Sequence, residues 1–170
     1  MSLKERLLRR KINKQTRHAH FPDWDKVQTI RLLAETGNEA ENAIIEDVCR
    51  QLQQAGKTVW LTTYTDSKEP INLSVGSSLC RKDFTLFGSP KKTVIATLQQ
   101  PADVLIDLSN RPSLALRYLA LHTRADFKAG RKLSPEDTDG IHDMLIQTDN
   151  HGTLFVFQQI VHYLTTIRNK

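Results

Sequence analysis

The chain has 170 residues, a length that suits one domain, and 39% of them are hydrophobic. No run of about 20 consecutive apolar residues occurs, so we expect no membrane-spanning helix, and the frequent apolar clusters exclude a disordered polymer. The formal charge of +5 is unevenly distributed, because residues 1–20 carry seven basic side chains and one acid. The remaining 150 residues sum to −1, so we expect a basic N-terminal arm, residues 1–20, on a near-neutral single domain, residues 21–170.

The sequence carries no sign of export or of a cysteine-based metal site. A secretory signal needs an uninterrupted apolar segment, and Arg9, Arg10 and Lys11 interrupt the only one near the start. Cys49 and Cys80 lack CxxC or metal-ligand spacing, which argues against a zinc site and against a disulfide framework. We therefore expect a cytoplasmic protein with reduced thiols, no metal and no cofactor.

Residues 2–17 predict an amphipathic helix that protrudes from the domain. Ser2 and Glu5 have the spacing of a capping box, and apolar residues from Leu3 to Ile12 recur on one side. The basic side chains that could contact a partner are Arg6, Arg9, Arg10, Lys11, Lys14 and Arg17. Three interpretations remain open: charge-driven binding to nucleic acid, binding to an anionic membrane surface, or packing of the apolar side on the body or on a second copy.

The next elements follow a β-α-β order. Residues 27–33 form an extended run, and a helix then opens at Asn38, three residues before Glu41, and ends at Gly56. Residues 57–64 are rich in β-branched and aromatic side chains, as is typical of a strand.

The middle of the chain contains the clearest candidate for a central strand. The stretch 71–79 is ambiguous, whereas 83–87 predicts a strand and 90–99 a helix. Residues 102–108 are apolar at nearly every position, which is typical of a strand covered on both faces. We therefore expect residues 102–108 at the centre of the sheet.

The last third of the chain continues the alternation. Ser109 is expected to cap a helix with Pro112 in its first turn. Strands at 124–128 and 143–147 and a closing helix at 153–167 follow. These elements predict a three-layer α/β domain, with a mostly parallel sheet of about five or six strands and helices on both faces.

Ligands of such sheets bind beyond the carboxyl ends of the strands, so the strand-to-helix loops are the candidate sites. The expected loops are 35–38, 64–66, 88–92 and 107–111. None of them contains a dinucleotide-binding or P-loop fingerprint. An anion could bind where Ser89 and Lys91 open a helix, although an ordinary N-cap beside solvated lysines also explains these residues.

Asp107, at the end of the apolar strand, is a candidate general base or ligand-orienting group. A structural role is the alternative, because Asp107 could cap the next helix or pair with Arg111. The predicted ligand-binding residues are Ser89, Lys91, Asp107, Asn110 and Arg111. The histidines show no catalytic or metal-binding spacing, and Cys80 follows a Ser/Gly-rich run that is first of all typical of a loop.

Residues 102–132 resemble a segment of heptosyltransferase-type glycosyltransferases. The matching positions are Asp103, Ile106, Asp107, Leu108, Asn110, Arg111, Phe127, Gly130 and Arg131. The resemblance implies a Rossmann-like fold. Those enzymes place the active site between two such domains, and this chain has room for one, so we infer the fold and not glycosyl transfer.

The whole chain is also similar to small uncharacterised proteins of Bacteroidetes-type bacteria, a domain family of unknown function. The similarity rests on the short basic start, the segments IDLS and DFKAG, and the helical end. It implies a bacterial cytoplasmic setting and supplies no catalytic residue.

Two functional hypotheses follow. The first is a non-catalytic interaction module whose basic N-terminal helix contacts a partner subunit or an anionic surface. The second is a small enzyme or ligand-binding domain for a phosphorylated metabolite or nucleotide at the carboxyl edge of the sheet. The absence of a catalytic spacing in the sequence favours the first and argues against an enzyme.

Overall fold

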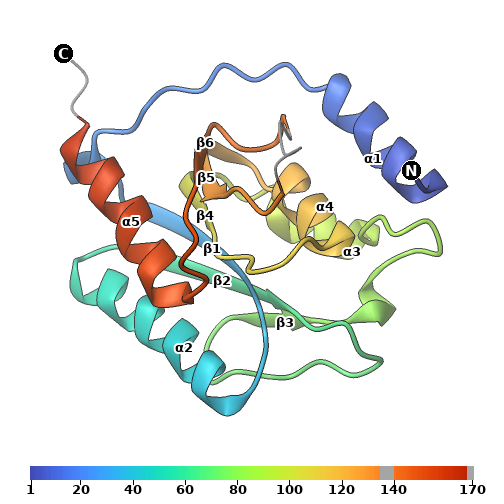
Figure 1. Cartoon of the computed structure of the whole chain (residues 1–170), viewed down its shortest axis with the longest axis horizontal. Coiled ribbons are helices and arrows are strands. Elements are labelled where there is room, and N and C mark those ends of the chain that lie inside the picture. Colours follow the sequence, from blue (N-terminus) through green and yellow to red (C-terminus); the bar gives the residue numbers. More distant parts are fainter. Residues whose placement is uncertain (135–139, 168–170) are drawn as a thin grey trace.

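The computed structural model describes residues 1–134 and 140–167 (Figure 1). Within them, six parallel strands form one sheet in the order β3-β2-β1-β4-β5-β6. The strands are β1 (Thr29–Glu35), β2 (Thr58–Tyr64), β3 (Ser77–Leu79), β4 (Ala102–Asp107), β5 (Ala125–Arg131) and β6 (Met144–Ile146). The helices are α1 (Leu3–Asn13), α2 (Glu39–Gln54), α3 (Lys92–Leu98), α4 (Leu114–His122) and α5 (Thr153–Thr166), with short 3-10 turns η1 (Trp24–Lys26) and η2 (Arg81–Asp83).

The sheet is the middle of three layers. On one face Ile106 packs in a core with Val48 of α2 and Ile160 of α5. On the other face Leu105 packs with Leu119 of α4, and α3 lies beside α4 (Figure 1). The three-layer α/β, Rossmann-like fold expected from the sequence is confirmed.

Strand β4 lies at the centre, as its apolar sequence predicts. It pairs with β1 on one side and with β5 on the other, and Val104, Leu105 and Ile106 are fully buried. From β1 the chain builds the sheet outward through β2 and β3, then crosses back to continue from β4 to β6. The strand order therefore reverses between β1 and β4, where ligands of such folds commonly bind.

The strand predicted at residues 83–87 is wrong. The turn η2 ends at Asp83, and Phe84 and Pro90 then make an isolated antiparallel bridge that closes a tight turn. Gly88 has φ of 83°, a left-handed conformation that reverses the chain at little cost for glycine. The edge strand β3 comes instead from the ambiguous stretch 71–79.

The helix predicted to begin at Ser109 begins four residues later. Ser113 is the N-cap of α4, and its hydroxyl accepts the N–H of Leu116 at 3.3 Å. Residues 108–112 therefore form an irregular loop at the carboxyl edge of the sheet, and helical spacing does not fix the directions of their side chains.

Helix α1 does not protrude, contrary to the sequence-based expectation. Leu8 is 1% exposed and packs in the core on the α4 side of the sheet. After the helix, Gln15 donates to the carbonyl of Leu121 at 3.2 Å, and Arg17 donates to the carbonyl of Ile141 at 3.2 Å. Part of the apolar side of α1 thus packs on the body. Within the residues that the structure describes, neither this helix nor any other has the length and apolar character needed to cross a bilayer.

Candidate functional site

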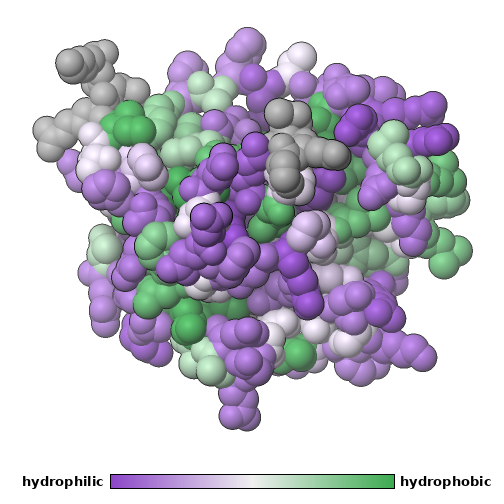
Figure 2. All heavy atoms as spheres, viewed as in Figure 1, coloured by the Kyte–Doolittle hydropathy of each residue, from purple (hydrophilic) through white to green (hydrophobic). Residues whose placement is uncertain are grey.

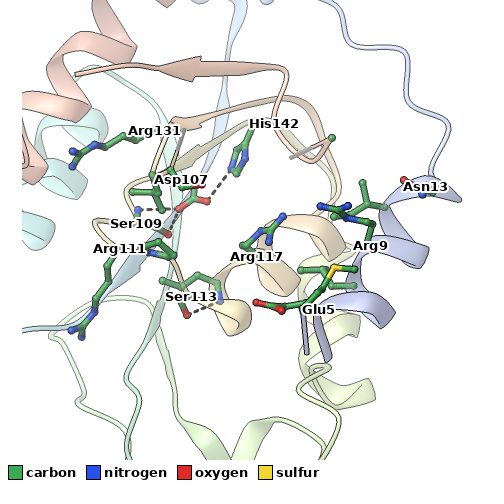
Figure 3. Close-up of a pocket in the computed structure, with 18 residues that line it drawn as sticks. Glu5, Arg9, Asn13, Asp107, Ser109, Arg111, Ser113, Arg117, Arg131 and His142 are labelled. Atoms are coloured by element: carbon green, nitrogen blue, oxygen red, sulfur yellow. Dashed lines mark hydrogen bonds and ion pairs between the residues drawn. The ribbon is translucent and has the colours of Figure 1, made fainter. Parts of the chain in front are cut away.

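A cavity of about 730 Å³ lies at the carboxyl edge of the sheet (Figure 3). Its walls come from α1, from the ends of β4 and β5, and from the first turn of α4. The polar and charged residues that line it are Glu5, Arg9, Asn13, Asp107, Ser109, Arg111, Ser113, Arg117, Arg131, Ser134 and His142. Four arginines and two carboxylates are among them, and the guanidinium groups of Arg111 and Arg131 point away from the space under α1, toward Glu35 and His151.

Asp107 ends β4 with its side chain 7% exposed. Its Oδ1 accepts the main-chain N–H of Ser109 at 3.0 Å and the Ser109 hydroxyl at 2.5 Å, and its Oδ2 lies 2.9 Å from Nε2 of His142. An ionised carboxylate only accepts hydrogen bonds, so beside it Nε2 carries the hydrogen and donates. Neither structural role expected for Asp107, a helix cap or a pair with Arg111, is observed.

Gly130 makes room for this pair. A Cβ added at Gly130 would lie 2.9 Å from both Cδ2 and Nε2 of His142, and 3.4 Å from Cβ of Asp107. Real side chains do not pack this closely, so any larger residue would displace the imidazole from the carboxylate. The contact between β4 and the segment before β6 therefore depends on a glycine in β5.

The Asp107–His142 pair is not arranged as a nucleophile triad. The Ser109 hydroxyl donates to the carboxylate and not to the imidazole, so His142 does not activate it as a base would. The part of the chain that the structure describes contains no group of three or more His, Cys, Asp or Glu that could hold a metal ion. The pair instead ties the end of β4 to the segment before β6.

Arg9 and Arg117 form the cationic part of the cavity between α1 and α4. Figure 3 shows both side chains in the space that separates the two helices, with Glu5 beside them. The pKa of the Glu5 carboxyl is lowered, chiefly by the main-chain N–H of Ser2 and to a smaller extent by charges that include Arg117. Nε of Arg117 is buried and has no hydrogen-bond partner among the described residues.

Arg111 extends away from the cavity and bridges the switch in strand order. Its Nε and Nη2 contact both carboxylate oxygens of Glu35, with N–O distances from 2.7 to 3.0 Å. Glu35 ends β1, whereas Arg111 belongs to the loop that follows β4. The ion pair therefore joins the two loops between which a ligand would enter in many related sheets.

Arg131 ends β5 and is 7% exposed. Its Nη2 donates to the carbonyl of Thr148 at 3.3 Å and to Nδ1 of His151 at 2.6 Å, both of which are neutral acceptors. Its Nε and Nη1 are buried without a hydrogen-bond partner, and no carboxylate of the described residues pairs with it. A buried guanidinium in such surroundings is stabilised by a nearby anion.

The structure separates the residues predicted to bind a ligand. Asp107 and Arg111 line the cavity, whereas Asn110 turns toward α5, where its Nδ2 donates to Oγ1 of Thr153 at 2.7 Å. Ser89 and Lys91 are not among the lining residues, and the Ser89 hydroxyl accepts from Nζ of Lys11 at 3.2 Å. The two predicted loops therefore do not meet in this cavity.

Sequence reasoning missed the residues that complete the site. His142, Arg117 and Arg131 lie on three different elements, and His142 is 35 positions from Asp107. No spacing rule links residues so far apart. The sequence pointed to Arg131 only as one of the positions in residues 102–132 that resemble glycosyltransferases, and it assigned Arg131 no role.

The family comparison covers nearly the whole chain. Residues 4–167 match the model of a family of unknown function, DUF6913. No match was found among curated proteins or among solved structures, and the resemblance of residues 102–132 to glycosyltransferases gains no support. The chain therefore belongs to the family of unknown function DUF6913, in agreement with its similarity to an uncharacterised domain family.

Proposed function

We propose that this domain binds a small anionic metabolite, one that carries a phosphate or carboxylate group, in the cavity under α1. The observation that carries the proposal is the pair Arg9 and Arg117 in a cavity at the carboxyl edge of a parallel sheet. This broadens the second hypothesis drawn from the sequence, which was a phosphorylated metabolite or nucleotide. Of the residues predicted for it, Asp107 and Arg111 line the cavity.

One arginine under α1 lacks a partner that a folded protein normally supplies. Nε of Arg117 is buried without a hydrogen-bond partner among the described residues. Arginine N–H groups bind carboxylate and phosphate oxygens in a planar, often bidentate geometry. An anionic ligand under α1 would therefore supply the hydrogen bond that Nε of Arg117 lacks, whereas the guanidinium of Arg131 points to the α5 side, toward Thr148 and His151.

The first turn of α4 adds to the attraction for an anion. Ser113, Leu116 and Arg117 from this turn line the cavity, and α4 has nine residues. The N-terminus of a helix carries a partial positive charge and unpaired N–H groups.

A thermal-shift and calorimetric screen tests this function. The probes are inorganic phosphate, ribose 5-phosphate, adenosine monophosphate and citrate, each at millimolar concentration. A ligand present at 100 times its Kd stabilises the folded state by about 2.7 kcal/mol. For a chain of this size, that corresponds to a rise in Tm of roughly 5–10 °C.

A matched pair of variants locates the site. Arg117→Gln and Arg124→Gln each remove one positive charge, but only Arg117 lines the cavity, while Arg124 is exposed at the opposite, amino edge of the sheet. We expect Arg117→Gln to weaken binding about tenfold, the loss of one charge-assisted hydrogen bond, and Arg124→Gln to leave it unchanged. The absence of any Tm shift across the probes, or an equal loss in both variants, overturns the proposal.

A further inference from the structure

The turn at residues 84–90 presents two large apolar side chains to solvent. Its base is fixed, because the ring of Phe84 packs edge-on against Tyr64 with a centroid distance of 5.3 Å. The main-chain N–H of Thr85 donates to the carbonyl of Ser89 at 2.8 Å, which closes the turn. At the tip, Leu86 is 90% exposed and Phe87 is 59% exposed. An ordered turn that exposes a leucine and a phenylalanine side by side is unusual unless the tip has a binding role.

The outer side of α1 combines apolar and basic residues. Leu3 is 62% exposed, and Arg10 follows seven residues later on the same side of the helix. Lys14, at the C-cap, continues this side and is also exposed. The single acid of the helix, Glu5, lies on the opposite side, in the cavity wall.

The turn lies against α1, so the two features form one surface. Nζ of Lys11 lies 3.2 Å from the Ser89 hydroxyl, and a Cβ at Gly88 would lie 3.6 Å from Cδ of Lys4. In Figure 1 the turn and the N-terminal end of α1 occupy the same edge of the molecule, and Figure 2 shows apolar atoms gathered at that edge. We define the docking face as Leu3, Arg10, Lys14, Leu86 and Phe87.

We propose that the docking face binds the surface of a bilayer rich in anionic phospholipid. Leu86, Phe87 and Leu3 would enter the boundary between headgroups and acyl chains, while Arg10 and Lys14 contact lipid phosphates. The chemistry favours lipid over single-stranded nucleic acid, because two of the three apolar side chains are aliphatic and offer no ring on which a base could stack. The proposed membrane binding does not depend on the ligand proposed for the cavity.

Vesicle flotation with the full chain tests the proposal. The probes are vesicles of phosphatidylcholine alone and vesicles in which about one third of the lipid is phosphatidylglycerol. We expect binding to the anionic vesicles to exceed binding to the neutral ones about tenfold, since each basic residue near such a surface adds attraction. The tryptophan introduced by Phe87→Trp should shift its emission to the blue on the anionic vesicles only.

Paired substitutions separate the docking face from general charge and hydrophobicity. Leu86→Ser/Phe87→Ser and Arg10→Gln/Lys14→Gln should each reduce binding about tenfold without changing Tm, because all four residues are exposed. The controls are Lys26→Gln/Arg50→Gln on η1 and α2, and Tyr163→Ser on α5, which should bind as the unaltered chain does. An equal loss in the controls, equal binding to neutral vesicles, or a self-association in sedimentation that only the docking-face variants abolish would each overturn the proposal.

Discussion

Strand β4 carries an aspartate near each end, and the two carboxylates have different kinds of hydrogen-bond partner. Asp103, at the amino end, accepts the main-chain N–H groups of Gln28 and Thr29 at 2.7 and 2.8 Å. Asp107, at the carboxyl end, accepts from Ser109 and His142 beside a cavity. The first completes the hydrogen bonding of the sheet where β1 begins, whereas the second holds side chains around a space.

This difference distinguishes the amino end of the sheet from the end where the candidate site lies. At the amino end Nζ of Lys57 donates to the carbonyls of Trp24 and Val27 at 2.9 and 2.6 Å, which again satisfies the main chain. Buried nitrogens without partners among the described residues occur on both sides, in Arg117 and Arg131 and also in Arg31 of β1 and His122 at the end of α4. What distinguishes the carboxyl end is the cavity that Arg117 lines.

Replacement of Asp107 should lower the free energy of unfolding more than any other substitution proposed here. Asp107→Ala leaves Ser109 and His142 without their buried acceptor, so the free energy of unfolding should fall by about 4 kcal/mol. Asp107→Asn keeps one acceptor oxygen and should lose less. Urea denaturation measures both; a loss below about 1 kcal/mol for the alanine variant would mean that the pair contributes little to stability.

Helix α1 covers the carboxyl end, so its buried leucine should matter nearly as much. Leu8→Ala removes a side chain that is 1% exposed and should lower the free energy of unfolding by about 3 kcal/mol. Leu3→Ala, on the outer side of the same helix, should change it by no more than about 0.5 kcal/mol. Similar values for the two variants would contradict the packing of α1 on the body.

At the amino end the expected effect is smaller and depends on pH. Burial raises the pKa of Asp103, but the N–H groups of Thr29 and Gln28 outweigh it, and the net pKa is lowered. Asp103→Asn should cost about 1 kcal/mol at neutral pH. Because the folded-state pKa lies below the unfolded-state value, this contribution is present above the unfolded-state pKa and disappears as the pH falls through the folded-state pKa.

The measurement for Asp103 is a comparison of urea denaturation at several pH values. The difference between the unaltered chain and Asp103→Asn should be constant near neutral pH and shrink as the carboxyl becomes protonated. A difference that grows toward acid would reverse the sign of the linkage and reject this role.

The smallest effect is expected at the ion pair across the switch in strand order. Glu35→Gln removes a partner of Arg111, whose side chain is 70% exposed, so water replaces most of the interaction. The free energy of unfolding should fall by about 0.5 kcal/mol or less. Calorimetric unfolding checks this value. A cost as large as that of Asp107→Ala would show that the Glu35–Arg111 ion pair stabilises the fold as much as the Asp107–His142 pair does.

The elements that the sequence predicted correctly are those with local signals. Asn38 and Glu41 form the capping box of α2 that their spacing indicates, with bonds of 2.9 and 3.1 Å. Residues 102–108 predicted a central strand because they are apolar at nearly every position, as is typical of burial on both faces. Each of these signals depends on neighbours within a few positions, and tertiary packing did not override them.

The errors occurred where a local pattern had more than one solution. Residues 83–87 have the apolar content of a strand, but Gly88 and Pro90 fold the chain back before it can pair with the sheet. Ser109 has the chemistry of an N-cap, yet its hydroxyl donates to Asp107, and Ser113 caps α4. When a side chain has two possible hydrogen-bond partners, only the three-dimensional positions of both partners show which bond forms.

The sequence by itself determined the α/β class, the order of the elements and the central place of β4, because hydrophobic periodicity and capping are local properties. Only the tertiary structure decided that α1 packs on α4, that His142 reaches Asp107 over Gly130, and that Arg9 and Arg117 share a cavity. These contacts join residues from separate elements, and their distances depend on how the helices pack on the sheet. The candidate site is therefore a product of packing, while the fold that carries it is largely a product of local sequence.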